Sequence, residues 1–236
     1  MHLLFFPFVG NSSESFHSFD NFLNEPIKTV TLEQSGRFTR KDEPVFDRIE
    51  DVSADLLEKV KPIITNDTYA IFCHSMGVLC CMEFIRQALE KNLPAPVHVF
   101  ISGRYAPDGS YFGNVDDYTD EGIVNFYVQK GLMQKSTLTD EKLIAEANAI
   151  LCHDMRMAEK YSEKYVRQPD FFQLPCDITV MYGIKDLLLE YADMNDWKRF
   201  TKKECDIISF RGGHFYYRLK KKAVCDIINS RLEKYK

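Results

Sequence analysis

The segment from Ile71 to Gly77 holds a serine in a setting that favours nucleophilic chemistry. An apolar stretch leads directly into Ser75, and helical spacing begins just after it. A strand that turns sharply into a helix strains the backbone at the turn and exposes a serine hydroxyl at the carboxyl edge of a sheet. The helix N-terminus also favours the negative charge that develops in acyl transfer. The same string fits a serine that only caps a helix, so it leaves both interpretations open.

Two further residues stand in the order of an α/β-hydrolase triad, which is serine, acid, then histidine. Asp186 follows an expected strand at 178–182, and His214 follows another at 206–210. Each alone is also explained as an ordinary loop residue. Because all three residues stand at the carboxyl ends of strands, we expect His214 to deprotonate Ser75. Asp186 would fix the imidazole tautomer and support the imidazolium.

An oxyanion hole for this chemistry needs main-chain N–H donors at two places. The residue after the nucleophile, Met76, supplies the first donor, and the loop after the first strand supplies the second. Phe8 and Val9 are the candidates in that loop, since Pro7 has no N–H.

Expected strands and helices alternate along most of the chain, as in a mostly parallel sheet with helices on both faces. The expected strands cover residues 3–6, 27–32, 69–73, 97–102, 178–182 and 206–210, and the expected helices cover 15–23, 47–60, 76–91, 197–202 and 219–235. Residues 116–166 interrupt this alternation with helical stretches at 121–130, 140–152 and 154–165. An all-helical insertion between two strands is where a lid would lie. We therefore expect one α/β-hydrolase domain over residues 1–236, with an inserted helical lid at 116–166.

The composition is that of a folded globular protein: of 236 residues, 45% are hydrophobic and 28% are charged. A formal net charge of -5 argues against general nucleic-acid binding, which relies on Lys and Arg to neutralise phosphates. Seven cysteines without paired spacing indicate reduced thiols, and none forms a zinc-site pattern with histidine. The apolar start is too short to span a membrane and lacks the features of a secretion signal. We expect a cytoplasmic monomer with no metal, nucleic acid or membrane among its partners.

Six short strings, taken together, resemble the type II thioesterases of non-ribosomal peptide and polyketide synthesis. They are Phe6-Pro7-Phe8-Val9-Gly10, Gly36-Arg37 followed by Glu43-Pro44, His74-Ser75-Met76-Gly77, Ser102-Gly103-Arg104-x-Ala106-Pro107, Gly183-x-x-Asp186 and Gly212-Gly213-His214-Phe215. The resemblance implies hydrolysis of acyl or aminoacyl groups from the phosphopantetheine arm of carrier proteins, which clears stalled assembly lines. It also implies a Ser75, Asp186 and His214 triad, a mobile lid, carrier-protein partners and no cofactor beyond the arm that the substrate carries.

Two positions depart from the family pattern. Gly10 is followed by Asn11 where a second glycine is usual, and asparagine tolerates the left-handed backbone better than most residues. Cys73 stands where the elbow usually has glycine, two residues before the serine. We expect Cys73 and Gly77, on either side of the turn, to approach each other closely, and cysteine is small enough to be tolerated there.

Other functions remain open alongside the leading one. A hydrolase of the same fold that acts on acyl-CoA or free esters would use the same triad, and a non-catalytic carrier-binding protein would keep the fold alone. Among the remaining polar residues, we expect His74 to give structural support, and His153 and Asp154 to lie on a solvated helix face. Apolar residues of the insertion either line an acyl channel or pack the lid; they are Phe126, Tyr127, Leu132 and Met133.

Overall fold

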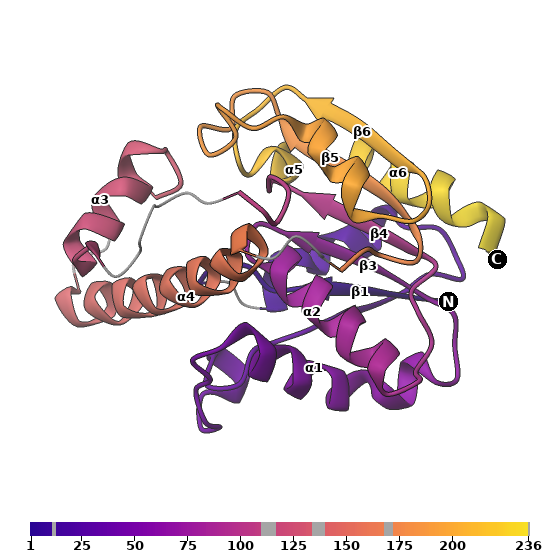
Figure 1. The fold of residues 1–236 in the computed structure, drawn as a ribbon, viewed down its shortest axis with the longest axis horizontal. Helices are drawn as coiled ribbons and strands as arrows, with labels where there is room; N and C mark the ends of the chain where they lie inside the picture. The colour runs from indigo at the N-terminus through magenta and orange to yellow at the C-terminus, as the bar shows by residue number, and fades with distance from the viewer. Residues whose placement is uncertain (11–12, 110–116, 134–139, 168–171, 236) are drawn as a thin grey trace.

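The computed structural model describes residues 1–10, 13–109, 117–133, 140–167 and 172–235 (Figure 1). Its centre is a sheet of six parallel strands in the order β2-β1-β3-β4-β5-β6. The strands are β1 His2–Phe6, β2 Lys28–Thr31, β3 Tyr69–His74, β4 His98–Ser102, β5 Asp177–Gly183 and β6 Cys205–Phe210. Each expected strand is present, and the expected α/β-hydrolase architecture is confirmed.

The central strand β3 shows why this sheet is covered on both faces. All of its residues are buried, as the apolar run 69–73 predicts for a strand inside a parallel sheet, and His74 at its end is buried too. Alternate side chains point to opposite faces: Ile71 and Cys73 join one core cluster, and Ala70 and Phe72 join the other.

Helices from different parts of the chain cover these two faces (Figure 1). The helices α1 Ile49–Ile64 and α2 Gly77–Glu90 pack against each other and fill the first core cluster. The helix α6 Lys221–Leu232 packs with the 3-10 helix η1 Ser13–Phe22 on the opposite face. Aromatic rings join η1 to the sheet, where Phe16 stacks on Phe5 with centroids 4.9 Å apart.

The helices α3 Asp120–Gln129 and α4 Glu141–Arg167 lie between β4 and β5 in the chain and to one side of the sheet (Figure 1). The expectation of two helices at 140–152 and 154–165 is wrong, because α4 is continuous. No glycine or proline interrupts this stretch, and the buried residues Leu151, Met155 and Ala158 keep one face apolar across the expected break. Residues 116 and 134–139 of the expected insertion lie outside the described residues.

Three other expected helices differ in kind or extent. The stretch expected at 15–23 is the 3-10 helix η1, and the one expected at 197–202 is the 3-10 helix η4 Met194–Phe200. The expected C-terminal helix is divided into α5 Tyr216–Leu219, α6 and the 3-10 turn η5 Glu233–Tyr235. A further 3-10 turn, η2 Phe38–Arg40, lies between β2 and α1. Within the described ranges, none of the helices has the length and apolar character needed to cross a membrane.

The strand β6 forms one edge of the sheet, and most of its side chains are half-buried. Asp206 of β6 forms an ion pair with Arg231 at 2.8 Å. A charged residue on an edge strand discourages pairing with another chain.

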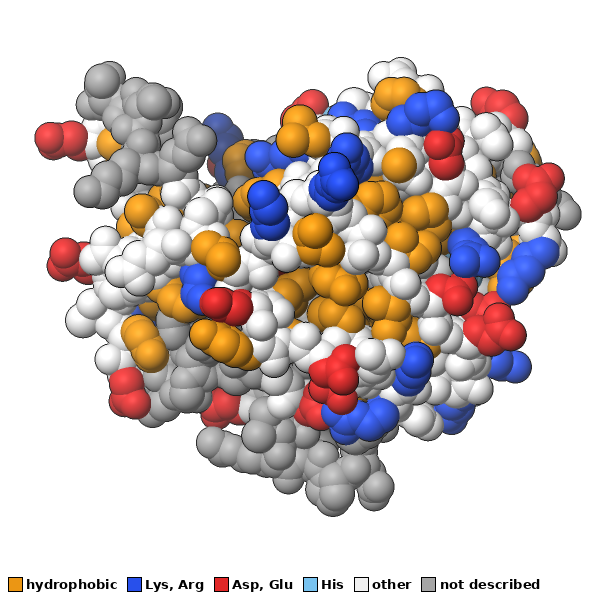
Figure 2. Space-filling view, turned by 90° about the horizontal axis from the view of Figure 1, so that it is seen from above, with side chains coloured by type: hydrophobic (Ala, Val, Ile, Leu, Met, Phe, Trp, Pro, Cys, Tyr) orange, Lys and Arg blue, Asp and Glu red, His pale blue; other side chains and the backbone are white. Residues whose placement is uncertain are grey.

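Viewed from above, the molecule has hydrophobic side chains gathered in the middle of its surface, with charged side chains around them (Figure 2).

Candidate active site

Ser75 occupies the turn between β3 and α2 with a backbone φ of +53°. A positive φ is uncommon outside glycine, and it marks the strained elbow that the sequence predicts. The Ser75 N–H donates to the Ser102 carbonyl at 2.9 Å, which ties the elbow to the end of β4. Only 6% of the serine is exposed.

The first turn of α2 lies directly against the end of β1. A Cβ at Gly77 would come within 2.7 Å of the Pro7 carbonyl oxygen and 2.9 Å of that of Phe6. The need for glycine at position 77 therefore comes from the β1 end, whose main chain supplies the nearest atoms. Cys73 is fully buried, and its thiol donates to the Phe100 carbonyl with sulfur and oxygen 3.4 Å apart.

Asp186 and His214 form a buried hydrogen-bonded pair. Asp186 Oδ2 lies 2.7 Å from His214 Nδ1, and the side chains are 0% and 5% exposed. The other carboxylate oxygen, Oδ1, accepts the Leu188 N–H at 3.0 Å. With both oxygens engaged, the carboxylate has one fixed orientation toward the imidazole.

The loops that carry this pair are joined through their main chains. The Ile184 N–H donates to the Phe210 carbonyl, and the Lys185 N–H donates to the Gly212 carbonyl, both at 2.9 Å. These bonds extend the β5–β6 pairing past the end of the strands. The structure thus places Asp186 and His214 together, at the edge of the sheet where β3 ends at Ser75.

His74 lies behind His214, with ring centroids 4.6 Å apart. Complete burial, together with the neighbouring His214 and Arg218, holds the pKa of His74 well below its usual value, so the ring is neutral. Its Nδ1 lies 2.9 Å from Ser102 Oγ, which lies 2.9 Å from the Tyr216 hydroxyl. These contacts agree with the structural support expected of His74.

The two segments expected to supply oxyanion donors meet at the elbow: Met76 follows Ser75, and the Pro7 carbonyl, one residue before Phe8, lies against Gly77. Met76 begins the turn into α2, and no hydrogen bond within the described part of the chain uses the N–H of Met76, Phe8 or Val9. The Phe8 ring packs edge-on against His74 at 5.2 Å. Val9 is half-buried and contacts the apolar cluster of α3 and α4 as well as the main core.

Asp154 does not lie on a solvated helix face, which corrects the sequence-based expectation. Only 1% of Asp154 is exposed. Its Oδ1 accepts from Arg37 Nη2, and its Oδ2 accepts from the Gly10 N–H, both at 3.0 Å. His153 is half-buried beside it, and the hydrogen bond with Asp154 raises the pKa of His153.

The partnership of Arg37 and Asp154 was missed because it spans 117 residues. Helical spacing can show which residues of α4 share a face, but not which distant loop that face meets. The Gly36-Arg37 string marks Arg37 as a residue of interest, but no comparable string marks its partner Asp154.

A pocket of about 450 Å³ opens between α3, the segment after β4 and the loop after Asp186. Phe126 of α3, Tyr105, Leu187 and Tyr191 contribute to its wall. The apolar residues of the insertion differ in their surroundings, and whether the pocket takes an acyl group stays a prediction. Phe126 lines this pocket and also packs against the α3–α4 cluster, in which Tyr127 is buried. Leu132 and Met133 pack against the same cluster.

The thioesterase domain family matches residues 1–232 of the chain. The gramicidin S biosynthesis protein GrsT of Aneurinibacillus migulanus is 26% identical over 219 residues, covering 92% of this chain and 82% of GrsT. The medium-chain S-acyl fatty acid synthase thioesterase of Homo sapiens is 24% identical over 217 residues, covering 91% of this chain and 80% of that protein. The crystal structure of ClbQ, from the colibactin NRPS/PKS pathway, is similar with a TM-score of 0.87 at 26% identity, covering 99% of this chain and 97% of ClbQ. The resemblance drawn from the short strings is confirmed, and the chain belongs to the thioesterase domain family.

Proposed function

We propose that the protein releases acyl or aminoacyl groups from the phosphopantetheine arm of carrier proteins, and so proofreads a peptide or polyketide assembly line. The observation that carries the chemistry is the buried pair of Asp186 and His214, 2.7 Å apart, at the same sheet edge as the strained Ser75. An aspartate that fixes one tautomer of a histidine, at the sheet edge where a serine lies on a strained turn, is the arrangement used for acyl transfer on this fold.

In the proposed reaction, Ser75 Oγ attacks the thioester carbonyl carbon while His214 Nε2 accepts the hydroxyl proton. The Met76 N–H and the N–H of Phe8 or Val9 stabilise the oxyanion. The carbon–sulfur bond then breaks, and His214 returns the proton to the leaving thiolate. A water molecule attacks the acyl-serine, His214 takes its proton, and a carboxylic acid leaves as Ser75 regains its hydrogen. Asp186 keeps Nδ1 protonated throughout and stabilises the imidazolium.

We also propose that α3 and α4 belong to the lid inserted at 116–166. The pocket beside α3 lies next to Leu187 and Leu188, which directly follow Asp186. A substrate arm in this pocket would thus reach the sheet edge under the insertion. The chemistry proposed here needs no metal and no cofactor apart from the substrate's own phosphopantetheine.

The names of the relatives support a synthase-bound substrate. GrsT is named for gramicidin S biosynthesis, ClbQ for an NRPS/PKS pathway, and the human protein for a fatty acid synthase. Carrier-bound thioesters, acyl-CoA and simple esters share the tetrahedral intermediate, so the triad does not separate them. The three substrates can be separated by comparing the hydrolysis rates of one acyl group carried by a carrier protein, by CoA and by p-nitrophenol. We expect the highest kcat/KM with the carrier protein, and a preference for the simple ester would contradict this substrate.

Ser75→Ala separates an enzyme from a non-catalytic carrier-binding protein. We expect the variant to lose acyl release by at least about 10⁴-fold, since serine and histidine act as a unit. Carrier binding, measured by isothermal titration calorimetry, should persist. His214→Ala should lose a similar factor. Unchanged turnover in Ser75→Ala would show that another residue is the nucleophile.

We place the protein in a reducing compartment, the cytoplasm. All seven cysteines are free, and six of them are buried. Burial raises the pKa of the Cys176 thiol to about 12, as it does for Cys225, so these thiols stay protonated.

A further inference from the structure

We propose that Asp154 is a positioning residue for the oxyanion hole. Its carboxylate holds the loop after β1, which carries the candidate donors Phe8 and Val9, against the helix α4. This inference rests on the proposed acyl transfer at Ser75 and adds a residue that touches neither the substrate nor the triad.

The carboxylate of Asp154 joins three segments that are distant in the sequence. Asp154 belongs to α4, and its carboxylate accepts two hydrogen bonds of 3.0 Å. One comes from the Gly10 N–H of the β1 loop, and the other comes from the guanidinium of Arg37, which follows β2. Arg37 is 7% exposed and Asp154 1% exposed, so water competes little for the bond between them, whereas the bond from the exposed Gly10 is buried on the carboxylate side only. A hydrogen bond to a charged group in such a site is roughly twice as strong as one between neutral groups.

Within the described residues, the main chain of Gly10 is held by the bond that its N–H donates to Asp154. Gly10 has a φ of +64°, and a Cβ built on it would meet nothing within 4 Å. The loop is therefore not fixed at this point by side-chain packing. The neighbouring Val9 does contact the apolar cluster of α3 and α4, so the loop touches the insertion through one side chain and one N–H.

A small displacement of this loop would matter for catalysis. Oxyanion donors act because they already point at the place where charge develops, and a shift of about 1 Å can reduce the rate about 100-fold. The N–H groups of Phe8 and Val9 lie one or two residues before the anchored Gly10 N–H. The Phe8 ring packs against His74 and Phe215, so releasing Gly10 would loosen mainly the Val9 side of this segment.

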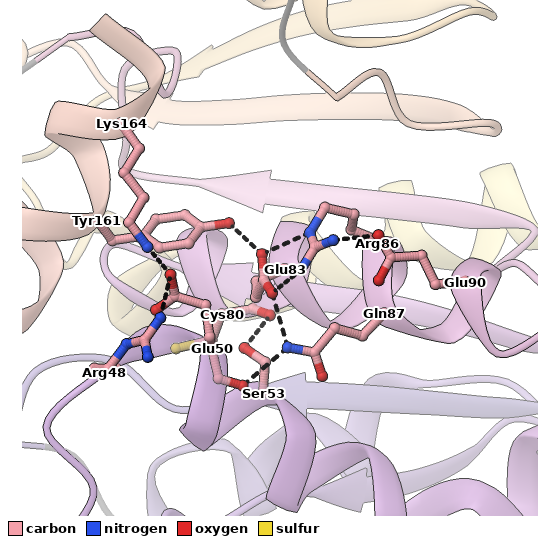
Figure 3. A network of polar contacts seen from close by, with 10 residues as sticks. All are labelled: Arg48, Glu50, Ser53, Cys80, Glu83, Arg86, Gln87, Glu90, Tyr161 and Lys164. Carbon is pink, nitrogen blue, oxygen red and sulfur yellow. Dashed lines mark hydrogen bonds and ion pairs between the residues drawn. The ribbon is translucent and has the colours of Figure 1, made fainter. Parts of the chain in front are cut away.

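The helix α4 is also anchored at a second place, away from the β1 loop (Figure 3). Tyr161 donates its hydroxyl hydrogen to the buried Glu83 of α2 at 2.8 Å. Burial opposes ionisation of Glu83, yet hydrogen bonds from Arg86, Gln87 and Tyr161 hold the pKa of Glu83 below its usual value. Tyr161→Phe thus removes one bond between α4 and the body of the protein without touching the loop after β1.

The test compares Asp154→Asn and Asp154→Ala with Tyr161→Phe in the full chain. Steady-state hydrolysis of an acyl thioester gives kcat and KM, and thermal unfolding checks each fold. We expect Asp154→Asn to lower kcat by about 10- to 100-fold, with KM changed by less than about threefold, because the loop acts mainly in the transition state. Tyr161→Phe should change kcat by less than about twofold at a comparable loss of stability.

Binding of an alkylboronic acid reads the same geometry without turnover. Ser75 Oγ would add to boron, His214 would accept the serine proton, and one boron hydroxyl would take the oxyanion position. We expect Asp154→Asn to weaken boronate binding by about the same factor as kcat, as a transition-state analogue should report. If Asp154→Ala unfolds, two other variants still test the inference. Asp154→Asn preserves the shape of the side chain, and Arg37→Met removes the ion pair by changing the other partner.

The outcomes separate this inference from the proposed function. If the unmodified protein hydrolyses thioesters through Ser75 but Asp154→Asn keeps full kcat and boronate affinity, the positioning role alone is overturned. An equal loss in Tyr161→Phe would also overturn it, since general anchoring of α4 would then suffice. If Ser75→Ala still binds the boronate and still turns over, the proposed function fails and the positioning role fails with it.

Discussion

Gly103 lies against the imidazole of His214, and a Cβ on this glycine would come within 3.3 Å of His214 Cε1. The same Cβ would lie 2.6 Å from Cε1 of His74. Gly103 has a φ of +60°, and its N–H donates to the Met181 carbonyl at 2.9 Å, which fixes the main chain there. The end of β4 can pass this close to the proposed base because position 103 has no side chain.

Gly103→Ala should therefore impair catalysis more than stability. The added methyl group collides with His74 and crowds His214, and the left-handed backbone adds a strain of about 1–2 kcal/mol. We expect kcat to fall by about 10-fold or more, because displacing His214 misaligns proton transfer and a shift of about 1 Å would cost about 100-fold. Steady-state kinetics and urea unfolding measure the two effects.

Gly131→Ala is the matched control for Gly103→Ala. Gly131 has a φ of +68° and open space where a Cβ would stand. The control should carry the same backbone strain with kcat near that of the unmodified protein. Equal kinetics in the two variants would show that contact with the imidazoles is unimportant.

Asp186→Asn should lower kcat by about 10³- to 10⁴-fold while the protein stays folded. The amide cannot stabilise an imidazolium, and it can donate to Nδ1 and so favour the wrong tautomer. The exposed Asp193, which caps η4 and also lines the pocket, provides Asp193→Asn as a control. A loss of similar size in both variants would point to the pocket's charge instead of the triad.

Much of the fold and the triad order could be predicted because both depend on local patterns. Apolar runs mark the strands, and the carboxyl ends of parallel strands meet at one sheet edge. Asp186 and His214 could therefore be placed near Ser75 without knowledge of the structure. Their 2.7 Å contact agrees with that expectation.

The features that could not be predicted depend on distant contacts. Nothing in the spacing of Arg37 and Asp154 indicates that they meet, and a polar pair at 153–154 resembles a solvated surface until its partners are known. The close approach of Pro7 to Gly77 likewise depends on how β1 sits beside β3. Local patterns also predict the ends of helices poorly, because packing decides whether the last turn is α-helical or 3-10.

Cys73→Gly tests whether the unusual elbow residue affects catalysis. The Cys73 side chain is fully buried in the core cluster of α1 and α2, with its thiol bonded to Phe100. Its removal leaves a small cavity and a flexible residue in a strand, so we expect a loss of about 1–3 kcal/mol in unfolding free energy. We expect kcat to change by less than about threefold at a temperature where both proteins are folded. A marked rise or fall in kcat would assign the elbow cysteine a direct influence on Ser75.

His98 should make the stability of the protein depend on pH in the acid range. Burial lowers the pKa of His98 to about 4, and its Nε2 lies 2.8 Å from Thr179 Oγ1. In the unfolded chain a histidine pKa lies near 6.5, so below that pH the unfolded state binds a proton that the folded state refuses. Above about pH 7, His98 therefore has no effect on the free energy of unfolding. As the pH falls from about 6.5 to about 4, it lowers that free energy progressively.

His98→Gln keeps a polar group near Thr179 but cannot titrate. Between pH 7 and pH 4 we expect the unmodified protein to lose more unfolding free energy than His98→Gln, by on the order of 3 kcal/mol. Urea unfolding at four pH values across this range measures the difference. A variant of the exposed His17 should give a curve parallel to that of the unmodified protein. If the stability of His98→Gln depended on pH in the same way as that of the unmodified protein, His98 would bind its proton equally well in the folded and unfolded states, which would contradict the prediction.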